Sequence, residues 1–501
     1  MKEKLDELKT RLLEINDLRM AAAVMSWDQT TYMPVKGAPA RARQMATIQR
    51  IAHEKNVAPE IERLLDDLDG YGKSLDPDSD EAAIIHEARR DFDRLARIPS
   101  RWMAAFLEHC ASSYDAWTRA RPADDFAAVR PCLEKTLDFS REYADFFPGH
   151  DHIADPLIDF MDHGMNAETV RTVFAELRRE LRPLVEAITA QTPADDSVLR
   201  RHYPKKLQEA IGKEFIQKFG FDFSRGRQDE THHPYMTKFS AGDVRITTRF
   251  REDDFGDGFF STLHECGHAL YELGIAPHLE GTVLGGGTSA GVHESQSRLW
   301  ENIVGRSRNF WEYAYPRVQA AFPEQLGGVP LDTFHRAINK VQRSLIRVDA
   351  DEVTYNLHVM IRFELELQML EGKLAIKDLP EAWRAAYRAD LGQAAPDDRD
   401  GVMQDVHWFD GLIGGAFQGY TLGNIMSAQF HGAALATHPE IPSEIGRGQF
   451  GALHGWMREN IYRHGGKYTA NQLLQRTTGG GLDTGPYLQY LRQKYGELYG
   501  L

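Results

Sequence analysis

Cysteine is scarce in this sequence, and long apolar runs are missing. Only three cysteines occur among the 501 residues, which is too few for a disulfide framework and typical of a protein kept in a reducing cytoplasm. No run of 18 or more apolar residues is present, so we expect no membrane span. The N-terminal stretch MKEKLDELKTRLLEINDL is charged and amphipathic and lacks the apolar region of a signal peptide. These absences together predict a cytoplasmic location.

Basic residues are fewer than acidic ones, and interdomain linkers are absent. The 59 lysines and arginines are outnumbered by 74 aspartates and glutamates, which gives a formal net charge of −15. Such an acidic chain is a poor partner for nucleic acid, and it can recognise a carboxylate only through a few local cations in a cleft. No Pro/Gly/Ser-rich linker, low-complexity tract or internal repeat divides the sequence. We therefore expect residues 1–501 to form one unit.

Helical periodicity dominates the chain, with apolar residues at three- and four-residue spacing. The segments that show it are residues 1–24, 79–98, 126–146, 167–190, 352–371 and 449–463. A β-rich character is confined to about residues 235–250, which we expect to form one short hairpin or small sheet. The sequence thus predicts a mainly α fold with a small β element.

A His-Glu-x-x-His string follows that β element, at His264, Glu265 and His268. On a helix, residues four apart lie on one face with Cβ atoms about 5–6 Å apart, so the two imidazoles can bind a single zinc ion. Glu265 is rotated away from the pair and is better placed to take a proton from a metal-bound water. By itself the string also fits an amphipathic helix with two partly buried histidines that bond to the backbone.

A third metal ligand is sought in the carboxylates nearby. Glu272 continues the same helix face but lies about 12 Å beyond His264 along the axis. A glycine-rich turn, GTVLGGGTSAG, then lets the chain reverse, and Glu294 stands near the start of the helix that we expect to return beside the first. Glu301 is the next candidate, as a ligand or as a residue that supports one. The alternative for Glu294 is a carboxylate that stabilises a helix N-terminus.

Three further segments carry residues suited to a cleft. Arg245 lies in the predicted β element, where it either faces solvent or supplies a cation. Arg347 lies among apolar residues, where it either clamps a carboxylate with two hydrogen bonds or forms an internal ion pair with Asp349 and Asp351. A later segment, GVMQDVHWFDGLIGGAFQGYTLGN, contains Gln404, Asp405, His407, Trp408 and Tyr420. A histidine and a tyrosine near zinc can hydrogen-bond an oxygen that becomes negative, and the alternative is an aromatic core turn.

In this order and spacing the segments resemble the carboxypeptidase Taq family of metallocarboxypeptidases, essentially over the full chain. The matching motifs are Trp27–Asp28–Gln29, Asp243–Arg245–Thr247 (D-x-R-x-T), the zinc helix from His264 to His268, His293–Glu294–Ser295–Gln296 (H-E-[SG]-Q), Ile346–Arg347–Ala350–Asp351 (I-R-x-x-A-D), and Gly401–Gln404–Asp405–His407–Trp408 (G-x-x-Q-D-x-H-W). One motif departs, because the family's H-P-F reads His233–Pro234–Tyr235 here.

The resemblance implies a single metallocarboxypeptidase unit over residues 1–501, largely helical and two-lobed, with a deep central groove. It implies a cytoplasmic homodimer that removes residues from free peptide C-termini with broad preference, and one zinc ion per chain, with cobalt as a possible substitute. The implied ligands are His264, His268 and Glu294, with Glu265 as the base. The implied substrate-binding residues are Arg245, Arg347, Asp243 and Gln404, and Tyr420 with His407 is assigned to the oxyanion.

Two other functions fit parts of the pattern. An endo-acting zinc oligopeptidase shares the zinc string and the groove but does not anchor a free C-terminus. A catalytically silent, metal-stabilised binding protein would need the metal alone. Glu265 argues against this last possibility, because a structural site has no use for a base and normally has a fourth protein ligand.

Overall fold

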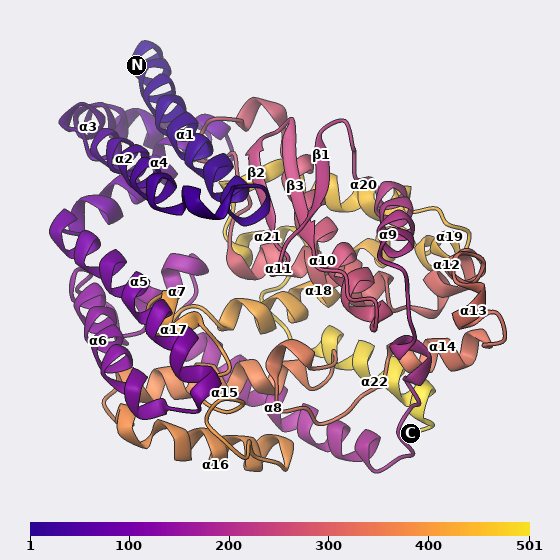
Figure 1. Ribbon diagram of the computed structural model, residues 1–501. Coiled ribbons are helices and arrows are strands. Elements are labelled where there is room, and N and C mark those ends of the chain that lie inside the picture. The colour runs from indigo at the N-terminus through magenta and orange to yellow at the C-terminus, as the bar shows by residue number, and fades with distance from the viewer.

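The computed structural model describes residues 1–501, and the chain is mainly helical (Figure 1). Every segment with helical periodicity forms a helix. These helices are α1 (Lys2–Thr31), α4 (Asp80–Arg97), α6 (Phe126–Asp145), α8 (Ala167–Thr189), α15 (Tyr355–Leu370) and α20 (Gly451–Asn460). The predicted fold class, mainly α with a small β element, is confirmed.

A further set of helices includes those that carry His264, Glu294, His407 and Tyr420. This set comprises α2 (Ala38–Asn56), α3 (Pro59–Ser74), α5 (Ser100–Ala123), α10 (Phe255–Gly274), α11 (Ala290–Arg298), α17 (His407–Asp410), α18 (Gln418–Thr437) and α22 (Gly485–Tyr499). Polar caps start the two motif helices: Asp254 accepts a hydrogen bond from the backbone N–H of Gly256, and Ser289 accepts one from that of Val292. Such caps satisfy backbone donors that have no partner inside the helix.

A three-stranded sheet lies directly beside α10 (Figure 1). Strands β2 (Met236–Ser240) and β3 (Asp243–Thr248) form the antiparallel hairpin expected near residues 235–250, and β1 (Gly226–Glu230) pairs with β3 in parallel. The sequence did not reveal β1, because its residues GRQDE carry no β-branched or aromatic side chain. Pairing with β3, a tertiary contact, makes this segment a strand.

Two separate apolar cores hold the molecule together. The main core joins 99 buried residues, whereas a second one of 15 residues belongs to the N-terminal helices α1, α3 and α4. The second core also includes Ile275, Leu279 and Leu284, from the segment between α10 and α11. The N-terminal helices are therefore anchored on the connection between the two motif helices.

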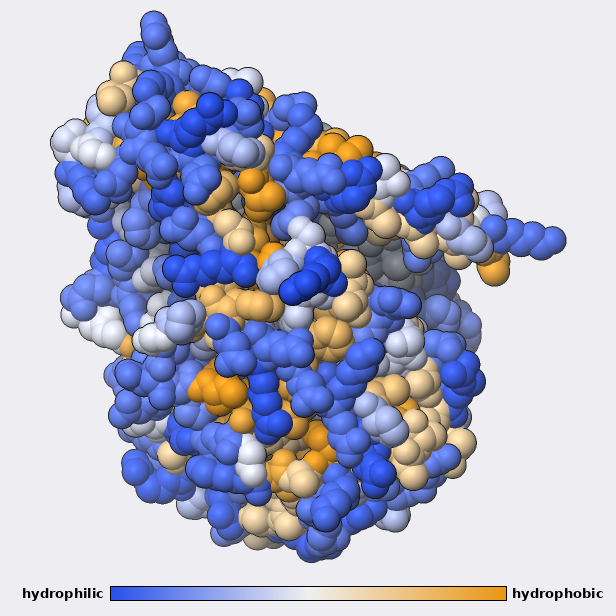
Figure 2. Space-filling view, turned by 90° about the vertical axis from the view of Figure 1, so that its left-hand side faces the viewer, coloured by the Kyte–Doolittle hydropathy of each residue, from blue (hydrophilic) through white to orange (hydrophobic).

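The face that carries α3 to α6 is covered mainly by hydrophilic side chains, with hydrophobic ones showing between them as small patches (Figure 2). Among the helices, none combines the length and the apolar character that a membrane crossing requires.

Candidate metal centre and active site

Helix α10 carries His264, Glu265 and His268, and a glycine inside the string brings α11 against it. A Cβ added at Gly267 would lie 2.4 Å from the carbonyl oxygen of Gln296. Only a residue without a side chain allows the two helices to approach this closely. The glycine within the His-Glu-x-x-His string thus has a packing role that places α11 beside the two histidines.

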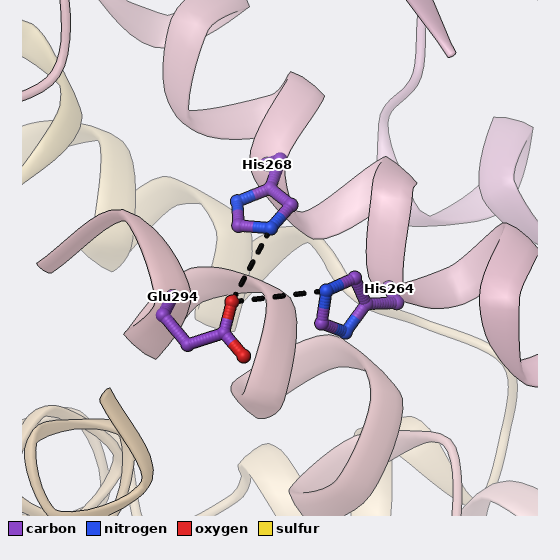
Figure 3. Close-up of side chains that lie close together, drawn as sticks. All are labelled: His264, His268 and Glu294. Atoms are coloured by element: carbon purple, nitrogen blue, oxygen red, sulfur yellow. Dashed lines mark ion pairs between the residues drawn. The ribbon is translucent and has the colours of Figure 1, made fainter. Parts of the chain in front are cut away.

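Glu294 on α11 faces both histidines of α10 (Figure 3). Its Oε2 lies 3.7 Å from His264 Nε2 and 3.4 Å from His268 Nε2. Ligands bound at about 2.0–2.1 Å in a tetrahedron are separated by roughly 3.3 Å, so the donor set fits a zinc-sized ion. No other group of three histidine, cysteine or carboxylate ligands in the chain meets this spacing. Burial lowers the pKa of His268 to about 4 and so keeps its ring neutral.

The two oxygens of Glu294 have different partners. Oε1 accepts a hydrogen bond of 2.7 Å from Nε of Arg298, while Oε2 faces the histidines and accepts a bond from the Ser297 hydroxyl. Burial by itself raises the pKa of Glu294, but the charge of Arg298 holds it well below its usual value. The carboxylate is therefore ionised and offers one oxygen to a metal.

Glu301 lies behind His264, and Glu272 lies outside the group of ligand atoms. Oε2 of Glu301 is 2.9 Å from His264 Nδ1, the nitrogen that points away from Glu294. Glu301 stands on a π-helical turn (Leu299–Val304) that follows α11 without a break. Glu272, the weaker of the alternative ligands, pairs with Lys238 and His293.

Glu265 is the one carboxylate of this cluster without a protein hydrogen-bond partner, although only 6% of its surface is exposed. Burial raises its pKa to about 7. A carboxyl group that titrates near neutrality and has no other partner has the properties of a general base.

Arg245 forms a closed ion pair. Its guanidinium donates two hydrogen bonds of 2.8 Å to Asp243. It also lies 4.2 Å from the ring centroid of Trp27, at the end of α1. Arg245 is thus engaged by Asp243 and does not simply face solvent, and the Trp27 stack adds a contact between the sheet and the N-terminal helices.

Arg347 is buried and bound to Asp405, whereas Asp349 and Asp351 are not its partners. Its Nη2 lies 2.7 Å from Asp405 Oδ1, and Arg362 binds Oδ2 of the same carboxylate. The alternative of an internal ion pair is right in kind but names the wrong partners, Asp349 and Asp351. Asp351 instead accepts hydrogen bonds from the backbone of Val353 and Thr354.

Gln404 holds the two arginines from the other side. Its Oε1 accepts hydrogen bonds from the backbone N–H of Arg347 (2.9 Å) and from Nη2 of Arg362 (2.7 Å). Its amide nitrogen donates to the carbonyls of Leu345 and Asp400. All polar atoms of this side chain are thus bonded within the protein.

His407 and Tyr420 come together next to Glu294. The Nε2 atom of His407 is 3.2 Å from the Tyr420 hydroxyl. Three residues along α18, a Cβ added at Gly423 would lie only 2.6 Å from Cβ of Glu294, so this part of α18 is pressed against the candidate metal centre. Burial, together with the charge of Arg347, lowers the pKa of His407 to about 4.

Three residues of the site escaped the sequence analysis as functional residues: Arg298, Arg362 and His293. The spacing of Glu294 and Arg298, four residues apart in one helix, could have revealed the first. Arg362 and His293 meet their partners only through the tertiary fold.

Comparisons of the sequence and of the structure with known proteins all indicate one family. The model of the carboxypeptidase Taq (M32) metallopeptidase family matches residues 7–495. Thermostable carboxypeptidase 1 of Thermus thermophilus is 42% identical over 96% of both chains, and carboxypeptidase 1 of Bacillus subtilis is 35% identical over 97% of both. The crystal structure of an M32 carboxypeptidase from Deinococcus radiodurans R1 superposes with a TM-score of 0.97 at 50% identity and covers 100% of each chain.

Proposed function

The chain belongs to the carboxypeptidase Taq family of metallopeptidases and is a peptide hydrolase, and on that premise we propose that it removes C-terminal residues from peptides with broad preference, using Glu265 as the base. The observation that carries the proposal is the triad of His264, His268 and Glu294, whose ligand atoms lie within 4.8 Å of one another beside an unpartnered Glu265.

We propose zinc as the metal, one ion per chain, with His264, His268 and Glu294 as its ligands and cobalt as a substitute. Two imidazoles and one carboxylate are the ligand set of catalytic zinc sites that keep a position open. When bound, zinc polarises the scissile carbonyl and lowers the pKa of a coordinated water.

Glu265 is proposed to move the proton. Its carboxylate takes a proton from the attacking water and delivers it to the nitrogen of the leaving amine, as general base and then general acid. The raised pKa of about 7 supports both steps, because the group exchanges a proton readily near neutral pH. Its freedom from other hydrogen bonds leaves the side chain available to the substrate.

Tyr420 is proposed to donate a hydrogen bond to the oxygen that becomes negative, with His407 holding the phenol. Burial raises the pKa of Tyr420 above its usual value, so the hydroxyl keeps its proton. The lowered pKa of His407 leaves that ring neutral, so it can hold the Tyr420 oxygen without adding a charge. A donor aimed at a developing oxyanion is worth about 2.7–4 kcal/mol.

The substrate carboxylate is proposed to bind at Arg347. Two arginines, Arg347 and Arg362, share the single carboxylate of Asp405, so this buried cluster retains one uncompensated positive charge. Arg245 and Asp243, by contrast, neutralise each other. A free peptide C-terminus supplies the missing negative charge, and Gln404 supports the site by holding both arginines.

The arginine cluster favours an exopeptidase over an endo-acting oligopeptidase. A timed digest of matched peptides with free and amidated C-termini, followed by mass spectrometry, tests this. We expect stepwise loss of C-terminal residues from the free acids and no cleavage of the amides. Internal cleavage of the amidated peptides would instead establish the endopeptidase, and zinc binding without any cleavage would establish a silent binding protein.

We further propose that residues 1–501 act as one catalytic unit, in the cytoplasm, as a homodimer. The separate core of the N-terminal helices supports a second lobe, and the free state of all three cysteines suits a reducing compartment. Light scattering tests the dimer: a mass of 56.8 kDa over a wide concentration range would contradict it.

A further inference from the structure

The two candidate ligand histidines have different partners at Nδ1, the ring nitrogen that points away from Glu294. The outer nitrogen of His264, Nδ1, contacts a carboxylate directly, at 2.9 Å from Glu301. The outer nitrogen of His268 contacts a second imidazole: its Nδ1 lies 2.6 Å from Nδ1 of His293. His293 directly precedes Glu294 on α11 and is therefore placed by the same helix that supplies the third ligand.

His293 in turn contacts a buried carboxylate. Its Nε2 lies 3.0 Å from Oε1 of Glu272, which also accepts a 2.8 Å bond from the backbone N–H of Gly287. The other oxygen of Glu272 receives a 3.0 Å bond from Nζ of Lys238, on strand β2. Burial raises the pKa of Glu272, but the His293 bond and the Lys238 charge outweigh it and bring the pKa to about 2. Glu272 is thus an acceptor only.

The partners along this chain determine where the protons lie. Since ionised Glu272 can only accept, Nε2 of His293 must donate to it. In a neutral ring the other nitrogen, Nδ1, is then the acceptor, and His268 must donate to it from its own Nδ1. This leaves a free lone pair on Nε2 of His268, the atom that faces Glu294.

Packing prevents the His293 ring from leaving this position. A Cβ added at Gly287 would lie 2.7 Å from Cδ2 of His293 and 2.8 Å from Tyr271. The Tyr271 and His293 ring centroids are 5.2 Å apart. The glycine-rich turn therefore closes directly over the imidazole while its backbone N–H binds Glu272.

We propose that His293 is a positioning residue that, through Glu272, fixes the tautomer and the ring orientation of His268 for metal binding. The inference rests on the proposed function, in which His268 is a ligand. In this arrangement Glu272, a carboxylate outside the ligand group, supports His268 through His293, whereas Glu301 supports His264 directly. Through Lys238 it also connects the edge strand β2 to the metal centre.

The test is the zinc dissociation constant of the full-length protein, measured by competition with a chromophoric chelator. His293→Phe keeps an aromatic ring but removes both nitrogens, and Glu272→Met removes the acceptor. We expect each variant to bind zinc about 10–100-fold more weakly, the range found when such supporting groups are removed. His293→Gln restores much of the loss, because its amide offers one acceptor and one donor.

Matched controls separate positioning from general damage. Tyr271→Phe removes a hydroxyl that accepts from Thr288, beside the same imidazole, and we expect it to bind zinc as the parent does. The double variant of His293→Phe and Glu272→Met binds no more weakly than His293→Phe alone, whereas adding Glu301→Gln to His293→Phe weakens binding further. The thermal midpoint of each metal-free variant shows whether it is folded.

Parent-like zinc affinity in His293→Phe overturns the proposal, and so does full additivity with Glu272→Met. If His293→Phe fails to fold, Glu272→Met decides, since it leaves the ring in place. Failure of the proposed function would look different. The parent would then bind no zinc, or a His268→Ala variant would bind zinc as tightly as the parent.

Discussion

Gly423 on α18 lies directly against Glu294 on α11, so closely that a β-carbon at residue 423 would be 2.6 Å from Cβ and 2.7 Å from Cγ of the glutamate. The two helices approach at the point where the third candidate ligand leaves its backbone. The position of the Glu294 carboxylate therefore depends on the absence of a side chain on the neighbouring helix.

Gly423→Ala should displace Glu294 and weaken metal binding. Overpacking of this kind costs about 1–3 kcal/mol of stability, and here the displaced group is the proposed ligand. Gly432→Ala is the matched control, because it lies on the same helix with no atom within 4 Å of the added carbon; it should stabilise the protein by up to about 1 kcal/mol. Chemical denaturation and zinc titration check both. Unchanged zinc affinity in Gly423→Ala would contradict the prediction.

Glu294→Ala should lose most of the bound metal, since it removes one of three ligand atoms. Glu301→Ala should retain metal but bind it more weakly, because Glu301 reaches His264 at its outer nitrogen, on the side away from Glu294. Metal analysis after dialysis gives the zinc content per chain for each variant. Full occupancy in Glu294→Ala, with loss in Glu301→Ala, would exchange the two roles.

Glu265→Gln should keep its metal and lose activity. An amide cannot accept the water proton, and general acid–base catalysis contributes about 10²–10⁴-fold, so we expect a loss in kcat of at least that size. Near-normal turnover at full zinc content would exclude Glu265 as the base. The residue forms no hydrogen bond with a ligand side chain, so its replacement should leave zinc affinity close to that of the parent.

Arg347→Ala should weaken the capture of free-acid peptides while zinc content stays unchanged. Removing one partner of a buried, hydrogen-bonded charge pair costs about 2–5 kcal/mol, which appears as a lower kcat/KM. Arg245→Ala is the comparison, because its guanidinium is neutralised by Asp243; we expect the smaller effect there. If both variants cleave free-acid peptides as the parent does, neither arginine binds the carboxylate.

Stability should fall as the pH rises from 4.5 toward neutrality because of Glu366. This carboxyl is fully buried, accepts a 2.8 Å bond from Trp408, and has its pKa raised by burial from 4.5 to about 7. The folded state therefore holds a proton that the unfolded state releases above pH 4.5. The stabilisation is complete below that pH and is lost by about pH 7, with a total near 3 kcal/mol.

Glu366→Gln removes this titration while keeping an acceptor for Trp408. Urea unfolding at pH 5 and pH 8 measures the effect for parent and variant. The parent should lose more stability than the variant between these pH values. Equal losses in the two proteins would show that Glu366 does not titrate in this range.

The sequence by itself determined the helical character of the chain and singled out the residues that form the candidate metal centre. Periodicity located α1, α4, α6, α8, α15 and α20, because an amphipathic pattern reflects which face of a helix is buried. The spacing of His264 and His268 fixes their common face through helix geometry alone. The glycine-rich turn signalled that a second helix returns, and Glu294 lies where that return predicts it.

Only the tertiary structure decided the partners of the charged residues. The polar segment β1 is a strand because its backbone pairs with β3. Arg347 pairs with Asp405, and not with Asp349 or Asp351, which are closer in sequence, because the fold packs two distant segments together. His293 and Glu272 are 21 residues apart and meet through the folded turn at Gly287. Local sequence carries backbone preference and side-chain spacing, whereas pairing between buried charges depends on the closure of long loops, which no local pattern encodes.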